Sequence, residues 1–285
     1  MVEDKLTERK VLEFLEEDLG FGDITTNALI PEQTTAEARI ISKREGVIAG
    51  IQEADIIFKL LNIDSKPLVK DGDRVTRGQI IVELSGSARN ILMAERTVLN
   101  IMMRMSGIAT ETSKLVDAAK KINPKLRIAC TRKTTPGFRY FEKKAVALGG
   151  GDIHRFRLDD MVLIKDNHIS VVGSVTEAVN RARSKCSFSK KIEIEVENAD
   201  QAIEAARAGA DIIMFDNMSP EDAKKTLELL EKKGLRDSVL IELSGGITPE
   251  NIDRYMALNV NIISMGYIIH SIRALDISLD FKKMR

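Results

Sequence analysis

Six short apolar runs alternate with helical patterns from residue 126 onward, and this alternation constrains the fold more than any other feature of the sequence. Each run has the length of a strand, and apolar residues between the runs recur at the helical period. Consecutive runs lie about 20 to 35 residues apart, as expected of βα units, which in series build a parallel sheet. The predicted strands are residues 127–130, 161–164, 192–196, 211–215, 239–243 and 261–265, and the predicted helices are 141–148, 175–184, 199–208, 220–233 and 249–258.

The ends of these runs favour a barrel over an open, doubly wound sheet. A doubly wound sheet concentrates its site at one switch point, whereas a barrel carries functional groups at the carboxyl end of every strand. Every run here is followed by polar residues, and glycines follow the last two runs, where barrels commonly hold a phosphate. The residues concerned are Arg132, Lys133, Lys165, Glu195, Glu197, Asp216, Asn217, Ser244, Gly245, Gly246, Ser264 and Gly266.

The first part of the chain follows other patterns. Residues 4–19 have the apolar spacing of a helix. Residues 36–84 alternate in short runs with glycine turns, which is typical of antiparallel strands. Within this region we predict a hairpin over residues 36–50, with its turn at 45–46, and a short helix over residues 54–61.

Between residues 87 and 123 the apolar period is helical again. Gly107 interrupts this pattern, so we expect two helices rather than one. Arg96 lies on the first of them, directly after Glu95. The ordinary role of such an arginine is an exposed ion pair.

Charge and cysteine content narrow the possible functions. Lys plus Arg and Asp plus Glu both number 43, and this zero net charge argues against a general nucleic-acid binder, which normally has a basic excess. No apolar run approaches the ~20 residues of a membrane span, so we expect no membrane association, and the polar N-terminus is unlike a signal peptide. The two cysteines form no close-spaced motif, so we expect free thiols and a cytoplasmic location.

Five cationic side chains stand at the ends of two predicted strands or in the loop between them. A cation at the end of a buried strand is unfavourable unless an anion binds there. Glycines interrupt this loop, unlike an ordinary solvated charge run, and loops on a rigid scaffold commonly carry function. Arginine suits carboxylates and phosphates through its planar fork. We therefore predict a site for a polyanionic substrate, formed by Arg132, Lys133, His154, Arg155 and Lys165.

Two acids, Glu195 and Asp216, break this cationic pattern at other strand ends. Acids in an anion site are unfavourable unless they hold a metal, bind hydroxyls or stabilise a developing cation. A sugar phosphate would satisfy all three conditions, through ribose hydroxyls, Mg²⁺ on a pyrophosphate and an oxocarbenium-like transition state. Glu195 alternates with Glu193 and Glu197, so these three acids should share one face of their strand.

Ten segments spread over most of the chain together carry a family resemblance. They are EDLGFGDITT (17–26), ERTVLNIMMRMSGIAT (95–110), TRKTTPG (131–137), HR (154–155), LIKDNH (163–168), EIEVEN (193–198), FDN (215–217), ELSGGI (242–247), SMGYIIHS (264–271) and ALDISL (274–279). With these segments the chain resembles the quinolinate phosphoribosyltransferases, the decarboxylating nicotinate-nucleotide pyrophosphorylases. No single segment would suffice, but the set is specific and shows no departure at the motif positions.

The resemblance implies a reaction and an architecture. Phosphoribosyl would pass from phosphoribosyl pyrophosphate to quinolinate with loss of CO₂, giving nicotinate mononucleotide and pyrophosphate for de novo NAD biosynthesis, with Mg²⁺ as cofactor. The implied α/β fold has an N-terminal α/β sandwich domain over residues 1–106 and an incomplete, TIM-like α/β barrel of parallel strands over residues 107–271. Residues 272–285 would return to the first domain. A homodimer with sites shared between subunits is also implied.

The resemblance further implies roles for individual side chains at the quinolinate end of the site. The two carboxylates of quinolinate would be held by Arg132, His154, Arg155 and Lys165. Arg96 would reach in from the other subunit.

At the other end of the site, the resemblance implies a binding set for phosphoribosyl pyrophosphate. That set is Lys133, Glu195, Asp216, Ser244, Gly245, Gly246, Gly266 and His270. Catalysis would involve Lys133, Lys165, Glu195 and Asp216. The two acids among these would also hold Mg²⁺, directly or through water.

Two other classes of function stay open. One is a barrel aldolase in which Lys165 forms a Schiff base with a carbonyl substrate. The other is an altered-substrate paralogue of the family, of the molybdenum-transport-associated type. The intact set of cations for two carboxylates speaks against the paralogue, and borohydride trapping with a carbonyl substrate would reveal the aldolase.

Overall fold

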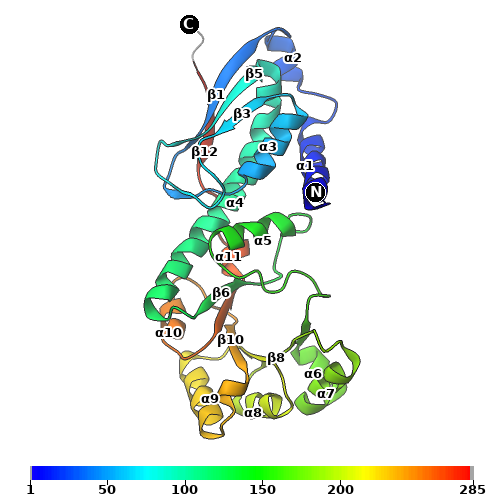
Figure 1. Ribbon diagram of the computed structural model, residues 1–285, viewed down its shortest axis with the longest axis vertical. Helices are drawn as coiled ribbons and strands as arrows, with labels where there is room; N and C mark the ends of the chain where they lie inside the picture. The colour runs from blue at the N-terminus through cyan, green and yellow to red at the C-terminus, as the bar shows by residue number, and fades with distance from the viewer. Residues whose placement is uncertain (1, 283–285) are drawn as a thin grey trace. The chain divides into compact units, whose positions relative to one another are not determined.

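The computed structural model describes residues 2–282, which divide into two compact α/β units (Figure 1). The first unit consists of residues 2–113, 138–150 and 272–282, and the second of residues 114–137 and 151–271. Each unit has its own sheet, antiparallel in the first and parallel in the second. Within the described residues, no helix combines the length and apolar character that crossing a membrane requires.

A six-stranded parallel sheet forms the centre of the second unit. Strands β7 to β11 follow one another in chain order, and β11, the last of them, pairs with β6, the first. This is the winding of a barrel, since a doubly wound sheet reverses its strand order. Among the described residues β6 and β7 do not pair with each other, so the predicted incomplete barrel is confirmed. The strands are β6 (Arg127–Cys130), β7 (Val162–Ile164), β8 (Ile192–Val196), β9 (Ile212–Asp216), β10 (Leu240–Ser244) and β11 (Ile262–Met265).

The six predicted strands all form, with each end within one residue of its expected position. They were recognisable because most of their residues are buried on both faces of the sheet and read as continuous apolar runs. Ile213 and Phe215 in β9 have no solvent exposure, and neither does Ile263 in β11.

Helices connect these strands and cover the sheet. Ser174, Asn198 and Ser219 each cap one of them, because each side chain accepts a hydrogen bond from the backbone N–H three residues later. Two short helices, α6 and α11, were not predicted from the sequence. The helices are α6 (Asp166–Val172), α7 (Val175–Lys185), α8 (Ala199–Arg207), α9 (Pro220–Lys232), the 3₁₀ turn η1 (Arg236–Ser238), α10 (Ile252–Met256) and α11 (Tyr267–His270).

Helix α5 (Arg139–Leu148) groups with the first unit, although the sequence pattern assigned it to the barrel. Aromatic packing explains the difference. The ring of Phe141, which has no solvent exposure, lies 5.4 Å from that of Phe14 in α1 (Val2–Leu19). In addition, Glu142 forms an ion pair of 2.8 Å with Arg104 of the first unit. The expected single range for the barrel therefore has to be interrupted at this helix.

The first unit is built on a four-stranded antiparallel sheet of order β12-β1-β5-β3. The last strand, β12, comes from the end of the described chain, which places residues 277–281 in this unit. The two-stranded sheet β2–β4, helices α1, α2, α3 and α5, and the part of α4 up to residue 113 complete the unit. The elements are β1 (Thr35–Ser42), β2 (Gly46–Val47), β3 (Asp64–Pro67), β4 (Arg74–Val75), β5 (Ile80–Ser87), β12 (Ile277–Phe281), α2 (Ile24–Leu29), α3 (Ile51–Leu60) and α4 (Ala88–Ile122).

The hairpin predicted over residues 36–50 is wrong. Strand β1 pairs with β12 on one edge and β5 on the other, so both of its edges are filled. Residues 46–47, expected to turn back onto β1, pair instead with β4. The alternating pattern identified the strands correctly, but it carries no information about which strand lies beside which.

The predicted break at Gly107 is also wrong, because α4 is continuous over 35 residues. A β-carbon at Gly107 would overlap the carbonyl oxygen of Arg273 and lie 2.9 Å from Cα of Ala274. Because Gly107 has no side chain, the segment that leads to β12 can pass close to α4 at this position. This close approach explains why a glycine is found inside the helix.

Candidate active site

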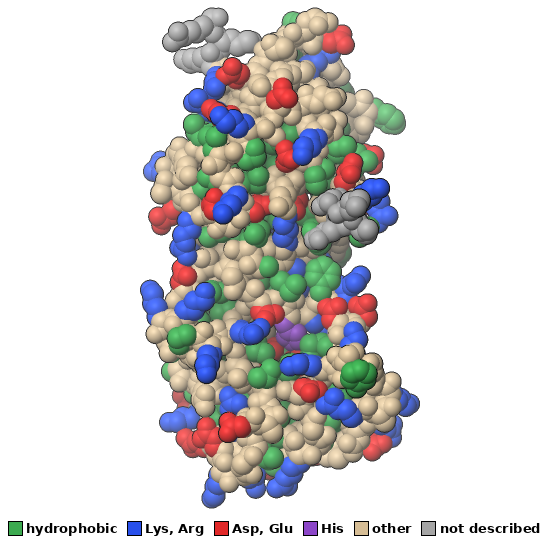
Figure 2. Space-filling model, in the orientation of Figure 1, with side chains coloured by type: hydrophobic (Ala, Val, Ile, Leu, Met, Phe, Trp, Pro, Cys, Tyr) green, Lys and Arg blue, Asp and Glu red, His purple; other side chains and the backbone are tan. Residues whose placement is uncertain are grey.

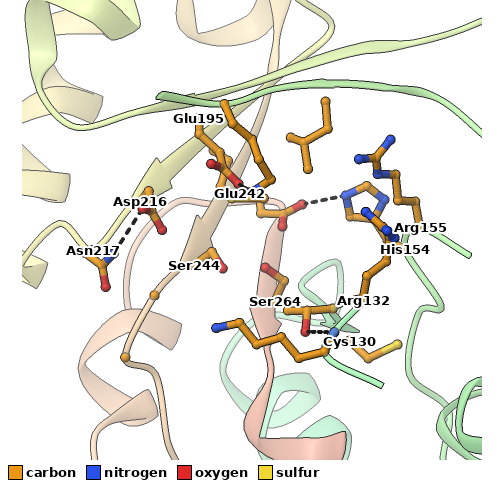
Figure 3. A pocket seen from close by; sticks show the side chains of 17 residues that line it. Cys130, Arg132, His154, Arg155, Glu195, Asp216, Asn217, Glu242, Ser244 and Ser264 are labelled. Atoms are coloured by element: carbon orange, nitrogen blue, oxygen red, sulfur yellow. Dashed lines mark hydrogen bonds and ion pairs between the residues drawn. The ribbon is translucent and has the colours of Figure 1, made fainter. Parts of the chain in front are cut away.

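The carboxyl ends of the parallel strands surround a cavity of about 480 Å³. Figure 3 shows His154 and Arg155 on one side of this pocket, with Asp216 and Asn217 across it. Ten of the residues predicted from the sequence line the pocket: Arg132, Lys133, His154, Arg155, Lys165, Glu195, Asp216, Ser244, Gly245 and Gly246. The strand ends thus bring together side chains that are more than one hundred residues apart in the chain.

Two arginines, Arg132 and Arg155, give the pocket its anion-binding character. The Nε atom of each is buried and has no hydrogen-bond acceptor among the described residues. Burial, and then the charge of Arg132, lowers the pKa of Arg155. Its guanidinium is held in place by donating to the carbonyl oxygen of Met161 at 2.8 Å. Two adjacent guanidiniums with unused donors are suited to bind an anion with several oxygen atoms.

An ion pair joins the cations to the acids of the pocket. Lys165, which follows β7, donates a hydrogen bond from Nζ to Oε1 of Glu195 on the neighbouring strand β8. Burial raises the pKa of Glu195, the bond from Lys165 opposes this, and the charge of Asp216 adds to the rise. The charge of Asp216 therefore acts on Glu195 across the pocket.

The loops after β9 and β10 approach each other closely. Asn217 has a left-handed backbone (φ 54°), and its Nδ2 donates to Oδ2 of Asp216 at 3.0 Å. A β-carbon at Gly245 would lie 2.7 Å from the backbone nitrogen of Asn217, so only glycine fits there. Asn217 lines the pocket and received no role in the sequence analysis, although the FDN segment includes it.

Gly266 and His270 adjoin the pocket without lining it. A β-carbon at Gly266 would lie 2.8 Å from Nε2 of His270 and 3.1 Å from Cδ of Lys133. Gly266 therefore lies against the side chains of both His270 and the pocket residue Lys133. Nδ1 of His270 lies 2.6 Å from Oγ of Ser271.

Arg96 is the predicted site residue that belongs to the first unit. It lies on α4 with 60% of its side chain exposed, and its Nη2 is 3.8 Å from Oε1 of Glu95. Among the described residues it does not line the pocket.

Sequence reasoning missed the part played by two buried acids, Glu193 and Glu242. Nε2 of His154 lies 2.7 Å from Oε2 of Glu193 and 3.6 Å from Oε2 of Glu242. Both acids have no solvent exposure. Burial, with the charge of Glu193, raises the pKa of Glu242 to about 8. From the sequence, Glu193 could be recognised only as a residue on the same strand face as Glu195. Glu195 lies nearer the strand end, and 14% of its side chain is exposed.

Two sequence models of one family match nearly the whole chain. The model described as "Quinolinate phosphoribosyl transferase, C-terminal domain" matches residues 108–280, and its N-terminal counterpart matches residues 23–106. The junction between the two matches falls inside α4.

Relatives are similar over almost the same span. A Methanothermobacter thermautotrophicus protein named "Probable nicotinate-nucleotide pyrophosphorylase (carboxylating)" is 50% identical over 96% of this chain and 99% of its own. The human nicotinate-nucleotide pyrophosphorylase (carboxylating) is 37% identical over 88% of this chain and 84% of its own. The structure of the nicotinate-nucleotide pyrophosphorylase from Francisella tularensis is 37% identical, with a TM-score of 0.89 over 98% of this chain and 97% of that one.

Proposed function

The chain belongs to the quinolinate phosphoribosyltransferase family, and we propose that its barrel pocket transfers phosphoribosyl from phosphoribosyl pyrophosphate to quinolinate. The reaction releases pyrophosphate and CO₂ and gives nicotinate mononucleotide, a precursor in de novo NAD biosynthesis. The observation that carries this proposal is the pair of buried, unpaired arginine Nε donors opposite two carboxylates. Such a pocket suits one substrate with several anionic oxygens and another with hydroxyls and a developing positive charge.

Quinolinate would occupy the cationic side of the pocket. Arg132, Arg155 and His154 would hold its two adjacent carboxylates, with Lys165 beside them. Because the Nε donors of both arginines are already desolvated, an anion gains hydrogen bonds there without displacing protein partners.

Phosphoribosyl pyrophosphate would occupy the side of the pocket formed after β8 to β11. Glu195 and Asp216 would accept from the ribose hydroxyls, and Lys133 would pair with a phosphate. The glycines after β10 and β11 let backbone N–H groups approach the phosphate oxygens, as at other barrel phosphate sites. The binding set is Lys133, Glu195, Asp216, Ser244, Gly245, Gly246, Gly266 and His270.

The two acids also fit a magnesium ion. Mg²⁺ is usually bound in proteins by one or two carboxylates together with substrate phosphates and water. Among the described residues one oxygen of Glu195 is engaged by Lys165 and one of Asp216 by Asn217, which leaves the second oxygen of each for the ion or its water. When bound, the ion would neutralise charge on the departing pyrophosphate.

The mechanism needs no base and no covalent nucleophile from the protein. The pyridine nitrogen of quinolinate attacks the anomeric carbon of ribose as the bond to pyrophosphate breaks. The ring nitrogen becomes a quaternary cation, so the adjacent carboxylate can leave as CO₂, and the carbanion left behind takes a proton from water. The protein orients the two substrates and places carboxylates near the developing positive charge.

We further propose a homodimer with shared sites. Arg96 is exposed in the first unit and has only a weak partner, so it is available to a second chain. Apolar side chains around α2 support such an interface, since Phe21, Ile24 and Leu29 are all largely exposed. For the cell compartment we propose the cytoplasm, where the exposed thiol of Cys186 would remain reduced.

The Schiff-base alternative is less compatible with this pocket. An imine-forming lysine needs an amine that is free to attack the substrate, and Nζ of Lys165 is engaged in a hydrogen bond with Glu195. An altered-substrate paralogue that does not bind quinolinate would not need the two desolvated arginines, Arg132 and Arg155.

The proposal is tested by incubating the protein with quinolinate, phosphoribosyl pyrophosphate and Mg²⁺. Mass spectrometry should detect nicotinate mononucleotide, and quinolinate labelled in the carboxylate next to nitrogen should release labelled CO₂. Absence of product under conditions where a relative is active would refute the proposal. Borohydride trapping with carbonyl substrates serves as the aldolase control and should label nothing.

A further inference from the structure

Two carboxylates without solvent exposure meet at His154. Glu193 comes from β8 and Glu242 from β10, two strands separated in the sheet by β9. Oε2 of Glu193 lies 2.7 Å and Oε2 of Glu242 lies 3.6 Å from the same atom, Nε2 of His154. Figure 3 shows the contact of Glu242 with the ring at the wall of the pocket.

His154 is the hydrogen-bonding partner that these acids have. Apart from its ring, the buried oxygens of Glu193 and Glu242 accept no hydrogen bond with good geometry from the described residues, although the hydroxyl of Ser264 also favours the charged form of Glu242. Burying carboxylates is unfavourable without a compensating cation or donor. The two carboxylates therefore favour the positively charged form of the His154 imidazole.

The acids around the ring all raise the pKa of His154. Burial lowers the pKa of His154, but the hydrogen bond and charge of Glu193 and the charges of Glu242 and Asp152 outweigh it, so the pKa is raised above its ordinary value of 6.5. The cations Arg132 and Arg155 line the same pocket and oppose this effect. The acids thus hold a third cation next to two arginines.

We propose that Glu193 and Glu242 are positioning residues for His154, which fix its ring through Nε2 and hold it as an imidazolium facing the pocket. The positive charge is delocalised over the ring, so the edge that faces the pocket presents it to a substrate carboxylate. Neither acid needs to touch substrate. The inference rests on the proposed function, in which His154 helps to hold quinolinate.

A metal ion between the three groups is the competing interpretation, because their ligand atoms lie within 4.8 Å of one another. A tetrahedral zinc ion at ~2.0–2.1 Å from each ligand would hold nitrogen and oxygen atoms about 3.3 Å apart. The 2.7 Å between His154 and Glu193 is instead a hydrogen-bond distance.

The charge of His154 can be measured directly, because the chain has only three histidines. We would record ¹⁵N chemical shifts of the imidazole rings against pH in the ligand-free protein and assign His154 by its loss in His154→Gln. Glu193→Gln should lower the titration midpoint of His154 by about one pH unit or more, and Glu242→Gln should lower it by less, because the raised pKa of Glu242 keeps its charge incomplete near neutral pH. If either variant fails to fold, the other still decides the question.

A matched control is available in the first unit. Glu53 also has no solvent exposure and forms an ion pair of 2.8 Å with Lys144. Glu53→Gln removes a buried charge of the same kind, and it should leave the midpoint of His154 unchanged. Glu193→Asp, which keeps the charge, should recover at least part of the wild-type midpoint.

Kinetics provide the second measurement. At a pH above the wild-type midpoint of His154, KM for quinolinate should rise about tenfold in Glu193→Gln, because a midpoint lowered by one pH unit then leaves a tenfold smaller charged fraction. KM for phosphoribosyl pyrophosphate should stay nearly constant. If the acids merely repelled the dianion, KM for quinolinate would fall instead.

Three results would overturn the inference. They are an unchanged midpoint of His154 in both glutamine variants, a fall in KM for quinolinate, and a shift of the wild-type His154 signals on treatment with a metal chelator. Failure of the proposed function is distinguishable, because the wild-type protein would then make no nicotinate mononucleotide while the titration of His154 could still be followed.

Discussion

The ammonium group of Lys165 donates a hydrogen bond to Oε1 of Glu195 across the carboxyl ends of two paired strands, β7 and β8. This bond connects a cation proposed to face quinolinate with an acid proposed to face ribose. A substitution of either residue therefore alters the charge available to both substrates.

The first prediction concerns substrate choice. Quinolinate has two carboxylates and nicotinate has one, so nicotinate would leave desolvated guanidinium donors of Arg132 or Arg155 without an acceptor. An unpaired buried group typically costs a few kcal/mol, which corresponds to a preference of about 100-fold or more in kcat/KM. Steady-state assays with both substrates measure this ratio. Comparable use of nicotinate would contradict the proposed role of the arginines.

The second prediction concerns the acids of the pocket. Glu195→Gln and Asp216→Asn should lower kcat by about 100-fold, because they remove charge placed near the developing cation. Affinity for quinolinate, measured by calorimetry, should not weaken in Glu195→Gln, since Lys165 would then be released toward the substrate. Glu197→Gln, an exposed acid just beyond β8, is the control and should leave both quantities near wild type. Weaker quinolinate binding with intact turnover would reverse the assignment.

The third prediction concerns Gly107 and the stability of the first unit. Alanine normally stabilises a helix relative to glycine by about 1 kcal/mol. At Gly107, however, the added β-carbon would overlap the backbone at Arg273 and Ala274. We therefore expect Gly107→Ala to lower the free energy of unfolding by about 1–3 kcal/mol. Denaturant unfolding measures the change, and Asn100→Ala, an exposed position on the same helix, should be nearly neutral. A more stable Gly107→Ala variant would show that the returning chain does not approach α4 closely.

The fourth prediction concerns sharing of the site between subunits. If Arg96 serves the pocket of a second chain, Arg96→Ala and Lys165→Ala should each be nearly inactive alone. In a mixed dimer one pocket would receive both defects and the other neither. Random mixing should restore about one quarter of wild-type activity, because half of the dimers are mixed and each has one good site.

The mixed dimers have to be verified before activity is interpreted. Native mass spectrometry after subunit exchange would establish their proportion. Verified mixed dimers that remain inactive would place Arg96 in the site of its own chain, or outside the site altogether.

The barrel and most of its pocket could be predicted from the sequence because the information is local. A strand buried on both faces is a continuous apolar run, and parallel strands carry their functional groups at one end. Lys165 and Asp216 stand directly after or at the end of such a run, and Arg132 is the second residue after one, so a common site followed once the strands were recognised. The sequence also suggested an anion site, since Arg132 and Lys165 follow buried strands that contain no acidic residue.

Only the tertiary structure decided which distant groups meet. Strand β1 pairs with β12 from the far end of the chain, and Gly107 passes that returning segment, neither of which local periodicity can indicate. The same holds for Glu193 and Glu242. The sequence shows that each acid lies within an apolar strand, but only the order of the strands in the sheet brings both acids to Nε2 of His154. Hydrophobic period is a property of neighbouring residues, whereas burial and charge pairing depend on the packing of residues that are far apart in the chain.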